Sequence, residues 1–294
     1  MTADLIITRE IAAIPDRADD AHKGDVGRIV VVGGCCGEVM MSGAPALAAT
    51  AALRSGAGLV HIMVPEAIRA AVAVLAPCAT LRTLPTDSKG LLAAVAEFGA
   101  DVIAFGPGLG RSLEPSVLVD VITGYSKPMV IDADGLNLLA AAGPFDISDA
   151  SRVVLTPHPG ELRRLLAARN ADREVGREPA SRRAAACALV EVYGCTVVLK
   201  GRGTIVTNAG RLYVNETGNA GMATGGTGDV LTGVIAALIG QRMEPFEAAI
   251  LGVYLHGLAG DFAAEELGRH AMTALDLIEY LPEAFSEHSL SEAQ

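Results

Sequence analysis

Short apolar runs alternate with longer helical patterns along most of the chain. Runs rich in Val, Ile and Leu between turn residues predict buried strands, and apolar residues three or four positions apart predict helices. Strands that alternate with helices are typical of a mainly parallel sheet covered on both faces. The pattern therefore predicts an α/β fold in three layers, a mainly parallel central sheet flanked by helices. Strands are expected at 28–32, 59–64, 101–105, 128–131, 153–155 and 196–199, and helices at 44–55, 65–75, 90–98, 114–122, 179–193, 246–265 and 272–281.

The folded part is expected to be one domain at 28–285, because no linker-like stretch and no repeat of fixed period divides it. Residues 1–27 are polar and mixed, so we interpret them as an N-terminal extension with one short helix at 6–12. Two β-rich runs around a glycine turn predict an antiparallel hairpin at 204–214. Residues 286–294 are expected to form a frayed C-terminal tail.

A run of small residues at 218–228 leads directly into an apolar helix that continues to Gly240. Glycines allow a backbone to bend sharply and to approach a ligand closely. The first turn of a helix has amide groups without internal partners, and the helix dipole adds positive potential there. We therefore assign an anion hole for a phosphate group to Gly226, Thr227 and Gly228. No Walker-type lysine follows the glycines, which excludes a P-loop.

Asp229 lies in the first turn of this helix, and two interpretations of it are open. An acid in a first helical turn is a common capping choice. A carboxylate beside a bound phosphate can also accept the proton of a neighbouring hydroxyl group. We favour the second interpretation and assign Asp229 as the catalytic base.

Five turns follow predicted strands at their carboxyl ends, where ligands bind in parallel sheets. We expect them to meet at one edge of the sheet beside the Asp229 helix, which strengthens the case for a phosphate-handling site. Taken alone, the Gly-Pro-Gly-Leu-Gly turn is equally compatible with a ligand surface and with an ordinary tight bend. The turns are 33–34, 106–110, 132–135, 156–161 and 200–204.

Other polar residues in these turns have structural explanations. Asp132 and Asp134 fit ordinary turn chemistry, which is the interpretation we favour for them. His158 and Glu161 could cap a helix and balance its dipole, or they could position a substrate and a hydrated Mg²⁺, with Glu161 acting through water. Lys200 could extend toward solvent or contact a phosphate, and we favour the phosphate.

Composition narrows the choice of partners. Hydrophobic residues make up 51% of the chain, and charged residues make up 19%. The formal net charge of −11 disfavours nucleic acid and an anionic membrane as partners, and a bound nucleotide would need local cations. Five cysteines without a metal-type spacing, and an N-terminus without a visible signal peptide, indicate a cytoplasmic protein.

Five segments in this order resemble the ADP-dependent NAD(P)H-hydrate dehydratases, a family of the ribokinase-like superfamily. The resemblance covers roughly residues 24 to 265, and the Leu-Arg-Ser-Gly-Ala-Gly-Leu-Val and His-Pro-Gly-Glu stretches separate the family from its kinase relatives. One departure is the loop 35–42, where Cys35-Cys36 replaces the expected serine and aromatic residue. The segments are 43–60, 106–110, 132–137, 156–161 and 225–231.

The resemblance implies repair of the S epimer of hydrated NADH or NADPH, with ADP split to AMP and phosphate and with Mg²⁺ as cofactor. It also implies a homotetramer and a separate NAD(P)H-hydrate epimerase as functional partner. By resemblance, the hydrate site comprises Ala44, Gly108, His158 and Asp229, and the AMP moiety contacts Lys200, Gly201, Arg202, Gly203, Thr204 and Gly228. The choice between NADHX and NADPHX stays open, as does the choice between ADP and ATP.

Two other functions fit part of this pattern. An ATP-dependent kinase for a small alcohol would use the same acid and the same anion hole. A nucleotide-binding module without turnover would use only the anion hole, and the presence of the acid argues against it.

Overall fold

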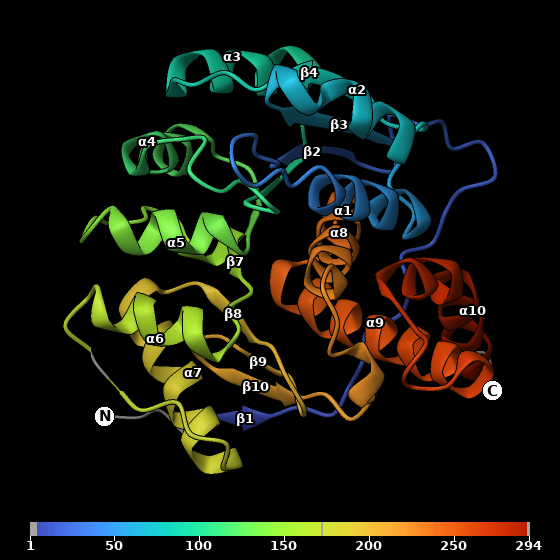
Figure 1. Cartoon of the computed structure of the whole chain (residues 1–294). Coiled ribbons are helices and arrows are strands. Elements are labelled where there is room, and N and C mark those ends of the chain that lie inside the picture. The colour runs from blue at the N-terminus through green and yellow to red at the C-terminus, as the bar shows by residue number, and fades with distance from the viewer. Residues whose placement is uncertain (1–4, 172, 293–294) are drawn as a thin grey trace.

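The computed structural model describes residues 5–171 and 173–292, and its central feature is a ten-stranded sheet (Figure 1). The strand order is β1-β10-β9-β8-β7-β6-β5-β2-β3-β4, and β9 alone runs antiparallel to its two neighbours within the part described. The strands are β1 Ile6–Ile7, β2 Arg28–Val32, β3 Leu59–Val64, β4 Thr80–Thr83, β5 Val102–Phe105, β6 Met129–Ile131, β7 Val153–Leu155, β8 Thr196–Leu199, β9 Ile205–Thr207 and β10 Arg211–Val214.

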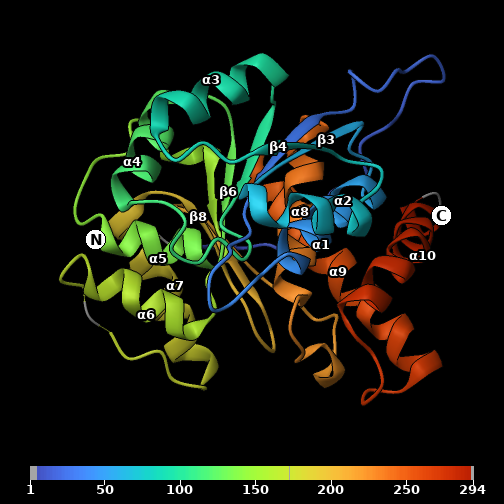
Figure 2. The ribbon, with the colours of Figure 1, turned by 45° about the horizontal axis from the view of Figure 1, so that its top comes forward.

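Helices cover both faces of the sheet, so the predicted three-layer architecture is confirmed (Figure 2). One face carries α1 Gly43–Arg54, α2 Glu66–Leu75, α8 Thr227–Gly240, α9 Pro245–Leu267 and α10 Ala274–Glu292. The other face carries α3 Ser88–Phe98, α4 Pro115–Gly124, α5 Asp134–Ala141, α6 Pro159–Ala167 and α7 Pro179–Tyr193. Two short 3-10 helices, η1 Ala150–Arg152 and η2 Ala220–Met222, complete the order.

Alternation along the strands divides the core into two parts. In β2, Ile29 and Val31 face the layer that contains α8, whereas Val30 and Val32 face the layer that contains α4. All four side chains are fully buried. This is the expected pattern for a strand in the middle of a parallel sheet, because both of its faces are covered.

Helix α8 is buried on nearly all sides from Val230 to Gly240, as its continuous apolar sequence predicts. It packs between the sheet, α1 and α9. A Cβ atom on Gly233 would lie 2.1 Å from the carbonyl oxygen of Ala48, so the two helices approach at backbone distance. This packing holds the amino end of α8 firmly at the edge of the sheet where β5, β6 and β8 end.

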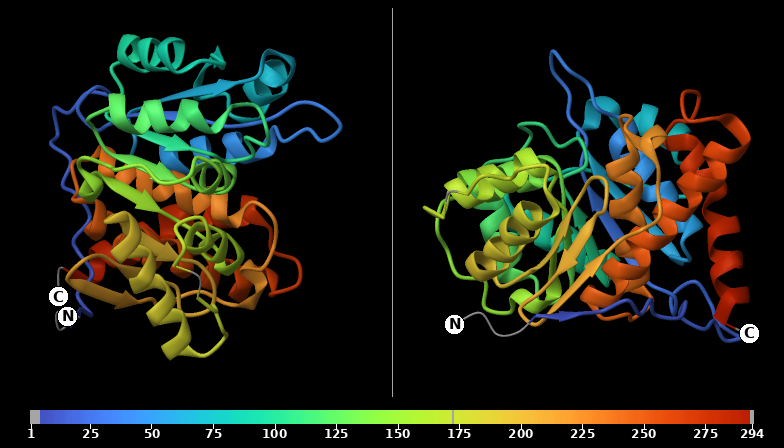
Figure 3. Two further views of the ribbon diagram at one scale, coloured as in Figure 1. Left: turned by 90° about the vertical axis from the view of Figure 1, so that its left-hand side faces the viewer. Right: turned by 90° about the horizontal axis from the view of Figure 1, so that it is seen from below.

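Two predictions about the ends of the chain are wrong. The helix expected at 6–12 is instead the edge strand β1 at Ile6–Ile7, because the amides of Ile6 and Thr8 donate to the carbonyls of Gly210 and Leu212. The chain then crosses toward α10 (Figure 3), where the Nε2 atom of His288 lies 3.0 Å from the carbonyl oxygen of Ala12.

The frayed tail expected at 286–294 is wrong as far as the described residues extend, because α10 continues through Pro282 to Glu292. Buried Ala284 and His288 continue the packed face of the helix beyond that proline, and this packing compensates for the lost backbone hydrogen bond. Residues 293–294 lie outside the described residues. The edge strand β4 at Thr80–Thr83 was not predicted, since its polar residues hide the β pattern.

Candidate active site

The five turns chosen from the sequence meet at one edge of the sheet, as predicted. The amide of Gly34 donates to the carbonyl of Pro107 at 2.9 Å, which joins the first two turns. The amide of Lys200 donates to the carbonyl of Pro157 at 2.9 Å, which joins the last two. Gly106, with a φ of +121°, approaches the carbonyl of Asp132 so closely that a Cβ atom would lie 1.9 Å from it. The edge is therefore one continuous surface.

The amino end of α8 has the geometry of an anion hole. Gly226 precedes the helix with a φ of 94°, a left-handed conformation that favours glycine. The amides of Thr227, Gly228 and Asp229 have no hydrogen-bond acceptor within residues 5–171 and 173–292. The first such bond of the helix runs from Val230 to the carbonyl of Gly226. Donors without acceptors at the positive end of a helix dipole are suited to bind a phosphate oxygen.

The carboxyl group of Asp229 lies beside these amides in an unfavourable environment for a negative charge. Burial raises its pKa to about 7, and the neighbouring carboxylate of Asp132 adds to the increase. The ammonium of Lys200 opposes this shift without cancelling it. A carboxyl group with a pKa near neutrality can both accept and release a proton at physiological pH, which is the property a general base requires.

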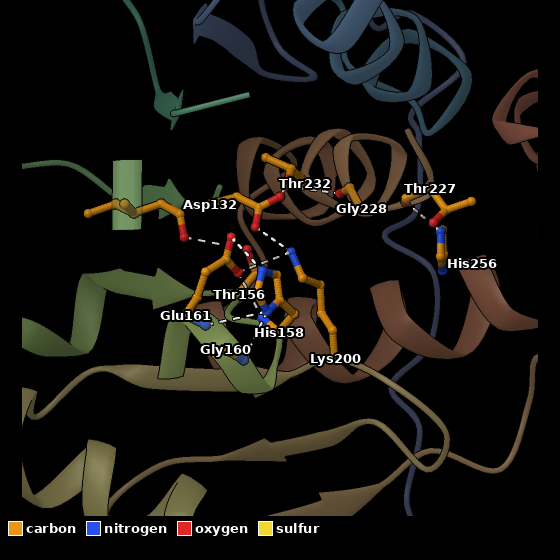
Figure 4. A network of polar contacts seen from close by, with 11 residues as sticks. Asp132, Thr156, His158, Gly160, Glu161, Lys200, Thr227, Gly228, Thr232 and His256 are labelled. Carbon is orange, nitrogen blue, oxygen red and sulfur yellow. Dashed lines mark hydrogen bonds and ion pairs between the residues drawn. The ribbon is translucent and has the colours of Figure 1, made fainter. Parts of the chain in front are cut away.

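Asp132 connects three elements of the site (Figure 4). Its side chain is 1% exposed, and its Oδ1 atom lies 2.5 Å from the Nζ atom of Lys200 at the end of β8. Its Oδ2 atom accepts a hydrogen bond of 2.7 Å from the hydroxyl of Thr232 on α8. The interpretation of Asp132 as ordinary turn chemistry is therefore incomplete. The residue does close a turn with Gly135, but its carboxylate holds a buried cation.

Lys200 points into this acidic group and does not extend toward solvent. Burial favours its neutral form, but Asp132 and Glu161 outweigh that effect and raise its pKa. Its Nζ atom lies 4.0 Å from the Glu161 carboxylate, and a Cβ atom on Gly228 would lie 3.3 Å from it. The ammonium is thus a permanent positive charge next to the anion hole.

His158 and Glu161 form a capping box at the start of α6. The Nδ1 atom of His158 accepts from the amides of Gly160 and Glu161, and the Glu161 carboxylate accepts from the amide of His158 at 2.8 Å. The structural interpretation of both residues is therefore correct as far as their contacts show. Burial and the nearby Lys200 lower the pKa of His158, and its side chain is half exposed at the edge of the sheet.

Ala44 and Gly108 lie next to each other on the far side of the edge. A Cβ atom on Gly108 would come within 2.9 Å of the Ala44 methyl group and 3.0 Å of the Cβ atom of Met41. The loop 35–42 therefore lies against the two predicted substrate positions. Cys35 is buried in this loop against Gly110, and Cys36 is exposed.

A cleft of about 1390 Å³ opens beside the anion hole. The predicted nucleotide residues Lys200 to Thr204 line it, together with Thr227, Gly228 and His256, whereas Ala44, Gly108, His158 and Asp229 lie outside its lining. Four cationic side chains of the lining have no hydrogen-bond or ion-pair partner among the described residues. They supply local positive charge that would attract an anionic nucleotide to a protein whose net charge is −11. They are Arg177, Arg183, Arg202 and Arg269.

Of these four arginines, only Arg202 was expected from the sequence. Sequence patterns did not reveal the other three, His256 or Asp132 as site residues. Arg177 and Arg183 flank the start of α7 in a region that reads as a charged loop and a helix surface, and Arg269 lies in the turn before α10. Distant segments form the cleft, and no spacing in the sequence links them.

A second cavity of about 670 Å³ lies at the opposite edge of the sheet. Both acidic and basic residues line it, among them Arg28, Asp101 and Arg152.

No group of three or more His, Cys, Asp or Glu side chains is arranged to hold a metal directly in the described part of the chain. Three carboxylates nevertheless surround a single ammonium: Asp132, Glu161 and Asp229 around Lys200. Burial raises the pKa of Glu161 as well. Uncompensated negative charge of this kind fits a divalent cation that keeps most of its water shell.

Within the described residues, no helix is long and apolar enough to span a membrane.

Comparison with known proteins identifies the family. A family model described as NAD(P)H-hydrate dehydratase matches residues 29–283. The chain belongs to this family. It is 40% identical over 256 residues to the ADP-dependent (S)-NAD(P)H-hydrate dehydratase of Neisseria meningitidis, an alignment that covers 86% of this chain and 82% of that protein. The chain spans about half the length of the bifunctional NAD(P)H-hydrate repair enzymes among its relatives.

Solved structures show the same architecture. The ADP/ATP-dependent NAD(P)H-hydrate dehydratase of Bacillus subtilis, co-crystallised with ATP/Mg²⁺, superimposes with a TM-score of 0.78 at 29% identity, over 94% of this chain and 95% of that one. A ribokinase-like superfamily protein of Enterococcus faecalis gives a TM-score of 0.77 at 28% identity, over 94% and 92%. The ribokinase-like fold expected from the sequence is therefore confirmed.

Proposed function

We propose that this protein dehydrates the S epimer of hydrated NADH or NADPH, using ADP and releasing AMP and phosphate. The observation that carries the proposal is the position of Asp229. This residue directly follows Thr227 and Gly228, whose amides have no acceptor and which line a cleft together with unpaired arginines. A base next to a phosphate site fits phosphoryl transfer to a hydroxyl group.

The reaction begins with ADP in the cleft, with its β-phosphoryl group at the anion hole. Asp229 removes the proton of the C6 hydroxyl of the hydrate as that oxygen attacks the β-phosphorus. The bond from this phosphorus to the bridging oxygen breaks, and AMP leaves. The amides of Thr227 and Gly228, together with Lys200, stabilise the charge on the transferring group.

The second half of the reaction expels phosphate in place of hydroxide, which is a poor leaving group. The lone pair of the ring nitrogen drives cleavage of the bond between C6 and oxygen. Loss of a proton from C5 then forms the double bond of the reduced nicotinamide. Ala44, Gly108 and His158 are the proposed contacts to the hydrate, because they belong to turns at the same edge of the sheet but lie outside the lining of the nucleotide cleft.

The nucleotide contacts are proposed for Lys200, Gly201, Arg202, Gly203, Thr204 and Gly228. Arg182 shapes this loop from behind, since its Nη2 atom donates to the carbonyls of Leu199 and Lys200 at 3.3 Å each. Mg²⁺ would be held near Glu161 through water and would neutralise charge on the phosphates. The direct metal test is stimulation of turnover by Mg²⁺ and its loss with a chelator.

The wider setting of the reaction is part of the proposal. We place the protein in the cytoplasm as a homotetramer. We also propose that it acts with a separate NAD(P)H-hydrate epimerase, since the proposed reaction uses only the S epimer of the hydrate. Light scattering of the purified protein tests the assembly.

Incubation of hydrated NADH with ADP tests the function against a kinase on the same fold. Recovery of the reduced-nicotinamide absorbance with release of AMP is expected. A stable phosphorylated alcohol, formed from ATP without recovery of that absorbance, would instead support the kinase.

A further inference from the structure

The segment that leads into the anion hole, residues 215–223, is fastened to α9. The amide of Gly218 donates to the carboxylate of Asp261 at 2.8 Å. The side-chain amide of Asn219 donates to the same carboxylate at 2.9 Å and to the carbonyl of Gly260 at 2.8 Å. Helix α9 therefore provides a fixed base for a segment that has almost no secondary structure of its own.

Two glycines of α9 allow this segment to approach. A Cβ atom on Gly257 would lie 2.2 Å from the hydroxyl oxygen of Thr217, and one on Gly260 would lie 2.5 Å from the sulfur of Met222. A side chain at position 257 would force the backbone of the segment at Thr217 to move, and one at position 260 would displace the side chain of Met222. The face of α9 that carries these glycines is thus shaped for the segment and for the anion hole that follows it.

His256 lies on the same face and contacts the anion hole itself. Its side chain is 9% exposed, and its Nε2 atom lies 2.9 Å from the carbonyl oxygen of Thr227. A carbonyl oxygen can only accept a hydrogen bond, so Nε2 carries the hydrogen. Burial lowers the pKa of His256 to about 4, so the ring is neutral at physiological pH, and its donor is fixed in one tautomer.

The carbonyl that His256 holds belongs to the same peptide unit as the amide of Gly228. A trans peptide unit is planar, so its C=O and N–H bonds point in opposite directions. A hydrogen bond to the oxygen therefore fixes the direction of the Gly228 N–H. It also polarises the peptide unit and strengthens that N–H as a donor.

We infer that His256 is a positioning residue for phosphate binding, and that it acts through the Thr227–Gly228 peptide unit on the β-phosphoryl group of the nucleotide. The inference rests on the proposed function for the identity of the phosphate. Nothing in the chemistry requires His256 to touch the nucleotide. Its contribution is the orientation and strength of one amide donor.

The test compares His256→Gln with His256→Leu. The glutamine amide can place an N–H donor near the Nε2 position, whereas leucine fills the space without a donor. We expect His256→Leu to weaken ADP binding and to lower kcat, each about tenfold, and His256→Gln to recover most of both. Calorimetry with ADP alone gives the binding result even if no hydrate is turned over, so a failure of the proposed function is seen separately.

Leu255→Ala is the matched control, because Leu255 is fully buried on the same helix and lies outside the cleft lining. It should lower the melting temperature and leave ADP affinity unchanged. The inference is overturned if His256→Leu binds ADP as tightly as the wild type, if glutamine rescues nothing in a folded protein, or if Leu255→Ala weakens ADP binding to the same degree.

Discussion

The ammonium of Lys200 and the carboxylate of Asp132 form a buried ion pair, 2.5 Å apart, between the ends of β8 and β6. Removal of one partner from such a pair leaves an uncompensated buried charge. Lys200→Met should therefore lower the free energy of unfolding by about 3 kcal/mol. Urea denaturation at neutral pH measures the change.

Lys127→Met is the control for this prediction. Lys127 pairs with Asp101 at 3.1 Å, but both side chains are 40% exposed or more. Exposed pairs contribute less than about 1 kcal/mol. If the two variants lose the same stability, the pair at the active site is not the buried, energetically coupled contact described above.

Asp229→Asn should abolish most turnover while the protein stays folded. Loss of a general base costs about 10² to 10⁴ in rate. Burial raises the pKa of Asp229 to about 7, so ionisation of this group costs stability as the pH rises from about 4 to 7. The variant should therefore be more stable than the wild type at pH 8, by roughly 2 kcal/mol after allowing for partial exposure, and equally stable near pH 4.

An assay of hydrate turnover tests the predicted loss of activity in Asp229→Asn. Melting temperatures of the variant and the wild type between pH 4 and pH 8 test the predicted difference in stability. Asp120→Asn changes an exposed acid on α4 and should alter neither quantity. Near-normal turnover by Asp229→Asn would show that another group removes the proton.

The pH dependence of kcat/KM reports the same carboxyl group. Asp229 must be ionised to act as a base, so the rate should rise with pH and level off above its pKa of about 7. After burial, the charge of Asp132 is the largest cause of that raised pKa. Asp132→Asn should consequently move the acidic limb of the profile to lower pH, whatever it does to the maximal rate. Asp101→Asn, at the opposite edge of the sheet, should leave the limb unchanged.

The layers and most elements of this fold could be predicted because they follow from local patterns. β2 at Arg28–Val32 is encoded by one short stretch of sequence, and the anion hole before α8 is encoded by another. The predictions for the two ends of the chain were wrong because the structure of these ends depends on partners that are distant in the sequence. β1 exists because β10 offers a free edge, and α10 passes Pro282 because its later residues are packed.

The same distinction separates the site residues that were predicted from those that were missed. Asp229 and Lys200 carry local evidence, namely a glycine-rich helix start and the end of a buried strand. Asp132 looked like a turn residue because its partners, Lys200 and Thr232, are 68 and 100 positions away. His256 lies in a helix that is apolar nearly all round, and only the packing of α9 against the loop before α8 brings it to Thr227.

The unpaired arginines of the cleft should contribute to nucleotide affinity. Arg183→Ala and Arg202→Ala should each weaken ADP binding about threefold to tenfold, and the loss should shrink at high salt because exposed charges are screened. Calorimetry at two ionic strengths measures both effects. Arg242→Ala alters the cavity at the opposite edge and is expected to bind ADP like the wild type. Equal losses in all three variants would point to a general effect of net charge.

The fate of the C6 oxygen tests the central claim most directly. Hydrated NADH that carries a heavy oxygen isotope in its C6 hydroxyl is incubated with the enzyme and ADP, and the released phosphate is analysed by mass spectrometry. If Asp229 prepares that oxygen to attack the β-phosphorus, the isotope must appear in phosphate. Unlabelled phosphate, with the isotope in water, would contradict the account, because the hydroxyl would then have left without ever joining the phosphoryl group.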